Sequence, residues 1–253
     1  MLNTNEFGES SGTPLILVHG LFGSARNWQG VAKRLSDGRR VVTVDMRNHG
    51  QSHWATPHDY HAMSDDLIDV IDDLGGSADV LGHSMGGKAA MVLALRAPQR
   101  VRRLIVADIA PIGYGHTQMP MIDAIRGVDL RAVTSRRDAD AQLARHLDDP
   151  GLRAFLLQSL DLYAPTPRWR LNLEVLARDM DKIMGFPDVT EIFAGEVLFV
   201  TGGESDYVRF AHHAHIRSLF PQAQFATVKD AGHWLHAENP KVFERLIRDF
   251  LQG

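Results

Sequence analysis

Residues 80–87 read Val-Leu-Gly-His-Ser-Met-Gly-Gly, and within them Gly82-His83-Ser84-Met85-Gly86 has the G-x-S-x-G pattern of a nucleophile elbow. In such a turn the chain leaves a buried strand, reverses sharply and enters a helix, and the serine takes a strained backbone conformation. Glycines stand two residues before and after the serine because side chains there would collide with the neighbouring strand and helix. The pattern therefore predicts that the chemistry starts at the Ser84 hydroxyl.

The flanking residues supply the context that this pattern requires. Residues 78–81 (Ala-Asp-Val-Leu) are typical of a short buried strand, and residues 88–98 read as an Ala-rich, buried helix that ends at Pro98. Strand, elbow and helix follow one another in the expected order.

Strand and helix patterns alternate along the rest of the chain. A helical stripe of apolar residues covers residues 60–74 and ends at Gly75-Gly76. Strands separated by helix-length segments indicate an α/β fold with a mostly parallel sheet and helices on both faces. Apolar runs predict the further strands of this sheet at residues 14–18, 40–45, 101–109, 196–201 and 224–228.

The pattern changes between residues 111 and 192 to helical stretches interrupted by prolines. An insertion of this length between two strands is too long for a plain loop. Open α/β sheets bind ligands at the carboxyl ends of their strands, where such an insertion can form a roof. We expect an α/β core of residues 1–110 and 193–253 and a helical cap of residues 111–192.

The composition is typical of a soluble enzyme. Of the 253 residues 44% are apolar, the net charge is −4 and the mean hydropathy is −0.17. No apolar run approaches the roughly 18 residues of a membrane span, and residues 1–10 lack the basic and apolar regions of a secretory signal. The lack of cysteine excludes thiol nucleophiles and Cys-based metal sites. We expect a cytoplasmic monomer or homodimer that binds a small molecule and neither nucleic acid nor membrane.

A serine nucleophile needs a base, and thirteen histidines compete for this role. His233 has the best position, because it lies directly after the last predicted strand and before a helix, in Ala231-Gly232-His233-Trp234. A catalytic histidine must come from a loop at the carboxyl end of the sheet. We therefore expect His233 to be the base.

The other histidines have simpler interpretations. We expect His83 to pack beneath the elbow and His19 to order the loop after the first buried strand. A third group, near the loop after the second such strand, is expected at the surface or in helix caps: His49, His53, His58 and His61. A last group resembles metal ligands but has no carboxylate at ligand spacing, so we expect a solvated helix face and no metal: His212, His213 and His215.

Attack on an ester carbonyl creates a negative oxygen that two backbone N–H groups must already face. One donor is expected to be Met85, the residue after the nucleophile, at the start of a helix. The other is expected to be Leu21, in the glycine-flanked turn of residues 19–23. The sequence thus predicts an oxyanion hole between these two segments.

The acid that orients His233 has two candidates. Asp206 lies in the loop after the penultimate predicted strand, where its position in the chain suits a triad acid, and Asp108 ends the strand before the cap. Either carboxylate can reach His233 while the other caps a turn or helix. Position in the chain alone suggests Asp206 as the acid, with Asp108 as the alternative.

The chain resembles the α/β-hydrolase fold family, and within it the bacterial YbfF-type esterases and their mitochondrial ABHD11-like relatives. The resemblance implies hydrolysis of short acyl esters by a Ser-His-Asp triad through an acyl-enzyme, with no cofactor, and it favours Asp108 as the acid. Five motifs carry it, at residues 19–24 (His-Gly-Leu-Phe-Gly-Ser), 44–52 (Val-Asp-Met-Arg-Asn-His-Gly-Gln-Ser), 82–88 (Gly-His-Ser-Met-Gly-Gly-Lys), 108–111 (Asp-Ile-Ala-Pro) and 232–238 (Gly-His-Trp-Leu-His-Ala-Glu).

Substrate choice is less constrained than reaction type, because the triad sets the chemistry and the cap sets the substrate. Thioester, lactone and C–C bond hydrolysis use the same triad, and a ligand receptor can keep the fold without turnover. An apolar acyl pocket is expected from four large side chains: Phe22, Met119, Trp169 and Trp234.

Overall fold

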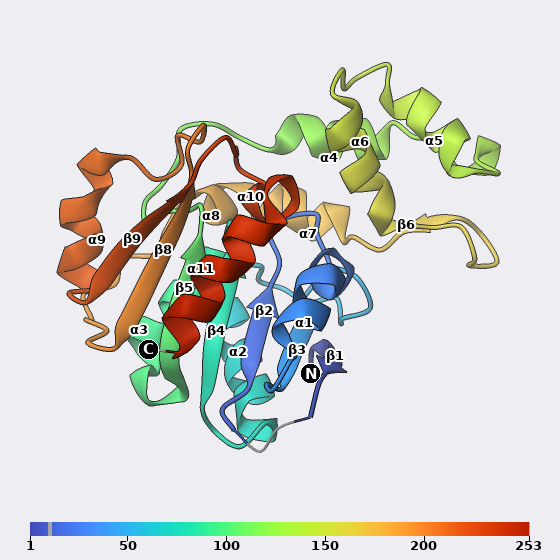
Figure 1. Cartoon of the computed structure of the whole chain (residues 1–253). Coiled ribbons are helices and arrows are strands. Elements are labelled where there is room, and N and C mark those ends of the chain that lie inside the picture. Colours follow the sequence, from blue (N-terminus) through green and yellow to red (C-terminus); the bar gives the residue numbers. More distant parts are fainter. Residues whose placement is uncertain (10–11, 253) are drawn as a thin grey trace.

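A seven-stranded sheet forms the centre of the molecule (Figure 1). The computed structural model describes residues 1–9 and 12–252. The strands lie in the order β1-β3-β2-β4-β5-β8-β9, and all neighbours are parallel except β1 and β3. Their bounds are β1 Asn3–Phe7, β2 Leu15–Val18, β3 Val41–Asp45, β4 Ala78–His83, β5 Val101–Ala107, β8 Glu196–Gly202 and β9 Ala223–Val228.

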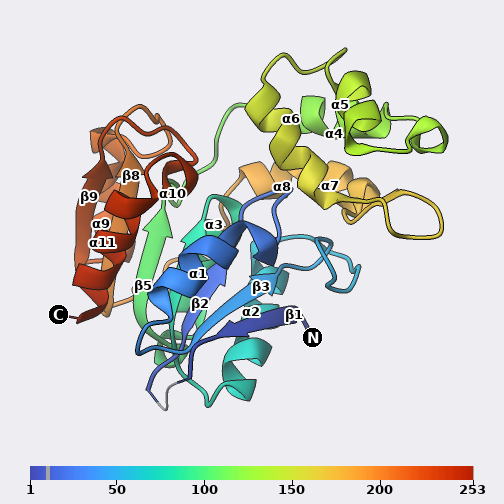
Figure 2. The same ribbon diagram turned by 45° about the vertical axis from the view of Figure 1, so that its right-hand side comes forward.

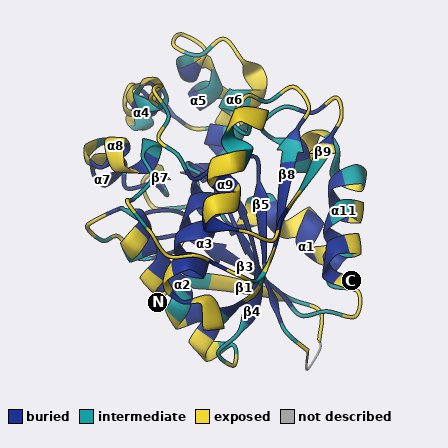
Figure 3. Cartoon of the chain, turned by 90° about the vertical axis from the view of Figure 1, so that its left-hand side faces the viewer, coloured by how far each residue is buried: buried dark blue, intermediate teal, exposed yellow. Residues whose placement is uncertain are grey.

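Helices cover both faces of this sheet because the strands carry apolar side chains on each face. In β2, Leu15 and Leu17 pack in the cluster formed with α1 and α11, whereas Ile16 and Val18 pack in the cluster formed with α2 and α3. Figure 3 shows the strands buried between these layers. The core helices are α1 Gln29–Leu35, α2 Tyr60–Asp73, α3 Met85–Arg96, α9 His213–Leu219, α10 Leu235–Glu238 and α11 Pro240–Gln252, with 3-10 turns at η1 Ala25–Trp28, η2 Pro98–Arg100 and η5 Phe210–His212.

The predicted α/β fold is confirmed, and each predicted strand is present within a few residues of its expected bounds. The edge strand β1 was not predicted. Its sequence, Asn-Thr-Asn-Glu-Phe, is polar, and it pairs antiparallel with β3 at the edge of the sheet. An edge strand is buried less than a central one, so it lacks the apolar run that marked the others.

The segment between β5 and β8 is mainly helical. Figures 1 and 2 show it beyond the carboxyl ends of the central strands. The assignment of residues 111–192 as a separate cap stays a prediction. The segment contains α4 Met119–Arg126, η3 Leu130–Ala132, α5 Arg136–Leu143, α6 Pro150–Leu156, η4 Leu157–Ser159, β6 Leu160–Asp161, β7 Arg168–Trp169, α7 Leu173–Arg178 and α8 Met180–Met184.

Buried hydrogen bonds tie this segment to the loops of the core. The Asn172 side-chain amide donates to Asn48 Oδ1 at 2.9 Å, and its backbone N–H donates to the Asn48 carbonyl at 3.0 Å. The Ser159 hydroxyl donates to the Phe22 carbonyl at 2.9 Å. The inserted helices are therefore fixed above the loops that follow β2 and β3.

The strand order determines where a ligand can bind. From β2 the chain moves outward to β3 and then returns to β4 on the other side of β2. Loops on the two sides of such a switch point diverge and leave a crevice at the carboxyl edge of the sheet. The elbow after β4 and the loop after β2 meet at this crevice. No helix in residues 1–9 and 12–252 is long and apolar enough to cross a membrane.

Replacing Gly86 by Ala tests how closely the elbow approaches β2. An added Cβ would lie 2.4 Å from the His19 carbonyl oxygen and 2.6 Å from that of Val18. Because backbone atoms cannot move aside, we expect a loss of about 2–3 kcal/mol in the free energy of unfolding, measured by urea denaturation. Gly115→Ala, with no atom within 4 Å of the new Cβ, should change it by less than about 0.5 kcal/mol. Equal effects would contradict this account.

Candidate active site

Ser84 lies at the sharp turn between β4 and α3. Its φ of 53° and ψ of −122° place it in a region that side-chain-bearing residues rarely adopt. Its backbone N–H donates to the Ala107 carbonyl of β5 at 3.1 Å, and its carbonyl accepts from Lys88 N at 3.0 Å. These bonds hold the strained residue from both sides and expose its side chain to the cavity at the carboxyl edge of the sheet.

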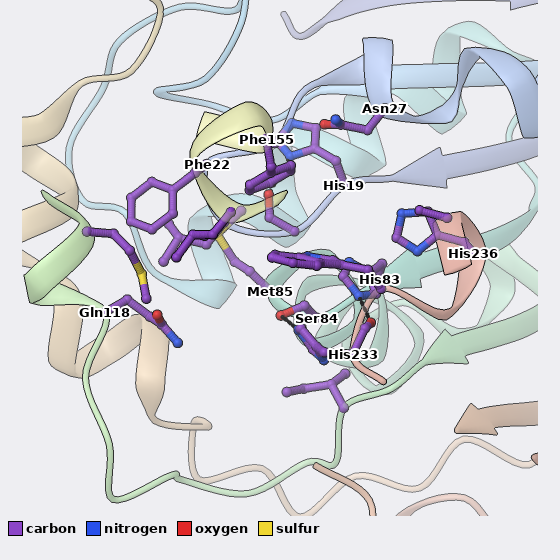
Figure 4. A pocket seen from close by; sticks show the side chains of 18 of the residues that line it. His19, Phe22, Asn27, His83, Ser84, Met85, Gln118, Phe155, His233 and His236 are labelled. Atoms are coloured by element: carbon purple, nitrogen blue, oxygen red, sulfur yellow. Dashed lines mark hydrogen bonds between the residues drawn. The ribbon is translucent and has the colours of Figure 1, made fainter. Parts of the chain in front are cut away.

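His233 lies between Ser84 and Asp108. Figure 4 shows the His233 side chain beside Ser84 at the cavity. Its Nε2 is 3.1 Å from Ser84 Oγ, and its Nδ1 is 2.8 Å from Asp108 Oδ2. Since a carboxylate only accepts, Nδ1 carries the proton and Nε2 is free to accept one from the serine. His83, beneath the elbow, donates from Nε2 to the His233 carbonyl at 2.8 Å and fixes the backbone of this loop.

Asp108 is fully buried, directly after β5, with a positive φ of 51°. The Gly202 N–H donates to its Oδ1 at 3.0 Å, and the Ser205 hydroxyl and His233 Nδ1 both donate to its Oδ2. Three donors from two loops and a strand therefore orient this carboxylate.

Asp206, the other candidate acid, lies elsewhere. Its side chain is 86% exposed and forms an ion pair with Arg209 at 3.2 Å. The loop after β8 instead contacts the site through its neighbours: Ser205 donates to Asp108, and the Tyr207 ring stacks on the His233 imidazole with centroids 4.1 Å apart. Sequence reasoning missed both residues, although the polar Ser205 beside a candidate acid was a usable signal.

The loop after β2 contains Leu21, whose backbone amide is one of the two expected oxyanion-hole donors. The Gly20 carbonyl accepts from His19 Nδ1 at 2.7 Å and from Gly23 N at 3.0 Å. In a trans peptide the next N–H points the opposite way, so these bonds turn the Leu21 amide away from the loop. Within the described residues neither this amide nor that of Met85, at the start of α3, donates a hydrogen bond to the protein. Both residues line the cavity.

Two histidines expected at the surface are buried instead. His49 and His58 are fully buried beneath the loop after β2, so the expectation is wrong for them. His49 Nε2 accepts from Phe22 N at 3.2 Å, and its Nδ1 donates to the Arg47 carbonyl at 2.9 Å. Likewise, His19 Nε2 accepts from Met46 N at 2.9 Å. Neutral imidazoles thus connect the loops that follow β2 and β3.

Burial holds these imidazoles in the neutral form. It lowers the pKa of His58 to about 3 and, with the nearby His233, that of His236 to about 4. The pKa values of His19, His49 and His83 are also lowered, in each case first by burial. These histidines near Ser84 are therefore uncharged.

A cavity of about 900 Å³ opens above Ser84 and His233. Of the four expected pocket residues, Phe22 and Trp234 line it, whereas Met119 and Trp169 do not. Trp169 is buried in the core cluster. Gln118 and Met121, which lie close to Met119 in the chain, line the cavity in its place. The inserted segment contributes a large part of the lining, with Gln118, Met121, Leu152, Phe155, Gln158, Ile183 and Met184.

The remaining histidine group does not converge on one point. His215 Nε2 donates to the Pro111 carbonyl at 3.0 Å, and His213 stacks on Phe225 with centroids 3.7 Å apart. In the part of the chain that the structure describes, no three His, Asp or Glu side chains are grouped to hold a metal ion.

Comparison with known proteins identifies the family. The sequence profile described as "Alpha/beta hydrolase family" matches residues 15–246. The chain belongs to the alpha/beta hydrolase family. It is 44% identical over 253 residues to the sn-1-specific diacylglycerol lipase ABHD11 of Mus musculus, with 96% of this chain and 82% of the relative covered. It is 37% identical over 246 residues to esterase YbfF of Escherichia coli (strain K12), with 96% and 94% covered.

A solved structure, described as a marine microorganism esterase, superposes on this hydrolase with a TM-score of 0.93, at 36% identity and with 98% of each chain covered. These matches confirm the resemblance to YbfF-type and ABHD11-like proteins. This alpha/beta hydrolase is an enzyme of the esterase and lipase type.

The buried histidines make the stability of this hydrolase depend on pH. The folded-state pKa of His236, about 4, lies below the roughly 6.5 of an unfolded chain. The unfolded state therefore binds the proton first, and stability present above pH 6.5 is lost as the pH falls towards 4. In this window each such group lowers the free energy of unfolding by up to about 1.4 kcal/mol for each pH unit of acidification.

His236→Phe keeps a ring against Trp28 and loses no hydrogen bond of Nδ1, which has no partner among residues 1–9 and 12–252. Between pH 7.5 and 5, its unfolding free energy should fall by about 2 kcal/mol less than that of the wild type. Urea titrations at both pH values measure this difference. Parallel declines would contradict the assignment.

Proposed function

We propose that the protein is a serine carboxylesterase that hydrolyses small, short acyl esters through a Ser84-His233-Asp108 triad and an acyl-enzyme intermediate. The main support is His233, whose two ring nitrogens lie 3.1 Å from Ser84 Oγ and 2.8 Å from Asp108 Oδ2. This is the arrangement in which a neutral imidazole accepts a serine proton while a carboxylate holds its tautomer.

Acylation begins when Ser84 Oγ attacks the acyl carbon and its proton passes to His233 Nε2. The carbonyl electron pair moves onto oxygen, and the oxyanion accepts hydrogen bonds from the amides of Leu21 and Met85. Asp108 stabilises the imidazolium that forms. Collapse of the intermediate restores the carbonyl, breaks the bond to the leaving oxygen and transfers the His233 proton to the departing alcohol.

Deacylation repeats these steps with water as the nucleophile. His233 takes one proton from water, the hydroxide adds to the acyl carbon, and the same two amides receive the second oxyanion. When this intermediate collapses, Ser84 Oγ leaves with the proton from His233 and the carboxylic acid is released. The cycle uses groups of this chain and one water per ester.

The segment of residues 111–192 acts in this proposal as the cap that selects the acyl group. Phe155 and Met121 from this segment and Phe22 from the core line the cavity above the serine. Because the reacting atoms come from the core, changes in the cap are expected to alter the acyl preference more than the reaction type.

Hydrolysis of larger acyl esters, such as acylglycerols, is the second candidate. A cavity of about 900 Å³ lies near the upper end of the range for small-molecule sites, roughly 300–1,000 Å³, and the mouse relative is named a diacylglycerol lipase. Turnover of p-nitrophenyl acetate, butyrate, octanoate and palmitate separates the two candidates, and an acyl-CoA series separates both from a thioesterase.

Ser84→Ala removes the proposed nucleophile and tests the function itself. We expect kcat for p-nitrophenyl butyrate to fall on the order of a millionfold, since loss of a triad serine has this effect in a serine protease. Labelling by a fluorophosphonate probe should disappear as well, while the urea midpoint stays near that of the wild type. Retention of a tenth of the activity would exclude this serine as the nucleophile.

The acid is tested by a matched pair of substitutions. Asp108→Asn should lower kcat by several orders of magnitude, because an Asn there favours the wrong His233 tautomer, at a cost of about ten-thousandfold in a serine protease. Asp206→Asn should change kcat by less than about twofold, because exposed ion pairs contribute little. Steady-state kinetics of both variants measure this contrast, and the reverse order would assign the acid to Asp206.

A further inference from the structure

Lys88 is a buried cation in the wall of the substrate cavity. It lies one helical turn after Ser84 on α3, where its N–H donates to the Ser84 carbonyl, so the two residues share a face of the helix. Only 1% of Lys88 is exposed, and it lines the same cavity as Ser84. An acyl group on Ser84 that extends along this face therefore passes the lysine.

The Lys88 ammonium has no negative partner in the described part of the chain. Its Nζ donates to the carbonyls of Met184 at 2.9 Å and Gly185 at 2.6 Å, and it lies 4.7 Å from the Tyr114 ring centroid. These contacts use two of three N–H groups, and the third has no oxygen acceptor among the described residues. Burial without a carboxylate lowers the pKa of Lys88 to about 7.

Among residues 1–9 and 12–252, the other groups around Lys88 carry no negative charge, and the Tyr60 ring centroid lies 5.7 Å from its Nζ. The Tyr114 hydroxyl donates to the Tyr207 carbonyl at 2.7 Å, and the Tyr60 hydroxyl donates to the Ile183 carbonyl. The remaining Lys, Arg, Asp and Glu side chains that line the cavity, Arg26 and Glu238, are exposed. Lys88 is thus the buried cation that a ligand meets inside the cavity.

A ligand seated against Lys88 changes the solvation of the ammonium. An apolar chain end would supply no acceptor for the third N–H, which leaves a buried charged group uncompensated. A carboxylate would accept the third N–H in a charge-assisted hydrogen bond and supply the missing negative charge. The site therefore discriminates between acyl groups by the charge at their far end.

We propose that Lys88 recognises a carboxylate at the far end of the acyl group, so that the preferred substrates are monoesters of short dicarboxylic acids. This rests on the proposed ester hydrolysis and names the substrate class of that site. Lys88 is then a specificity-determining residue, and its bonds to Met184 and Gly185 hold the ammonium at the correct place in the wall.

Paired esters test the proposal. Wild-type kcat/KM, measured by titration of released acid, should be at least about tenfold higher for monoethyl glutarate than for ethyl pentanoate, as expected for one charge-assisted contact. Lys88→Met should reverse this preference. Lys182→Met, the same change at an exposed lysine of α8 that pairs with Asp179, should leave it unchanged. Equal or better use of ethyl pentanoate by the wild type would overturn the proposal and leave Lys88 as a structural contact.

Calorimetric binding of glutarate and pentanoate to the wild-type enzyme gives a second answer that needs neither turnover nor a folded variant. Glutarate should bind at least about tenfold more tightly, and equal affinities would overturn the proposal. If neither ester is hydrolysed while glutarate still binds more tightly, the ester hydrolase function fails and the anion site stands. If both esters are hydrolysed equally and both acids bind equally, the function stands and the anion site fails.

Discussion

The approach of the elbow to its two neighbouring strands is the constraint on which the site depends. Gly86 lies against the backbone of Val18 and His19 at the end of β2, while the Ser84 N–H donates to Ala107 at the end of β5. Because β2, β4 and β5 are parallel neighbours, their carboxyl ends meet at one edge. These two contacts therefore set the relative positions of the loop that holds the Leu21 amide, the serine and the aspartate that follows β5.

Around these contacts, hydrogen bonds of neutral imidazoles join the backbone segments. His19 and His49 each use one ring nitrogen as donor and the other as acceptor, so each imidazole bridges two backbone segments. A charged imidazolium would have two donors and no acceptor and would break one of these bridges. Burial keeps their pKa values low, so the loop that carries the Leu21 amide keeps its shape without adding a fixed charge near the reacting carbonyl.

The local signals in the sequence singled out Ser84 and His233, whose side chains the structure brings together, because each lies in a short motif between a strand and a helix. Position in the chain suggested Asp206 as the acid, whereas the resemblance favoured Asp108. The structure brings Asp108 to His233, with Ser205 and Tyr207 turned towards them, and leaves Asp206 at the surface. Chain position does not reveal which side chains of a loop turn inward. A local sequence pattern also does not show that a segment distant in the chain will bury a residue. His49 and His58 lie in a polar loop sequence, yet the inserted segment covers them, as the bonds of Asn172 and Asp179 to this loop indicate.

The inserted segment was the least predictable part for the same reason. Apolar periodicity marks its helices but does not say which apolar side chains face the core and which face the cavity. Trp169 packs in the core, whereas Phe155 lines the cavity. Lys88 is a charged residue that the fold buries. It is held by the Met184 and Gly185 carbonyls at the end of α8. Helix α3 thus joins the two parts of the enzyme: Ser84 is its N-cap residue, and Lys88 in its first turn contacts the segment that lines the substrate cavity.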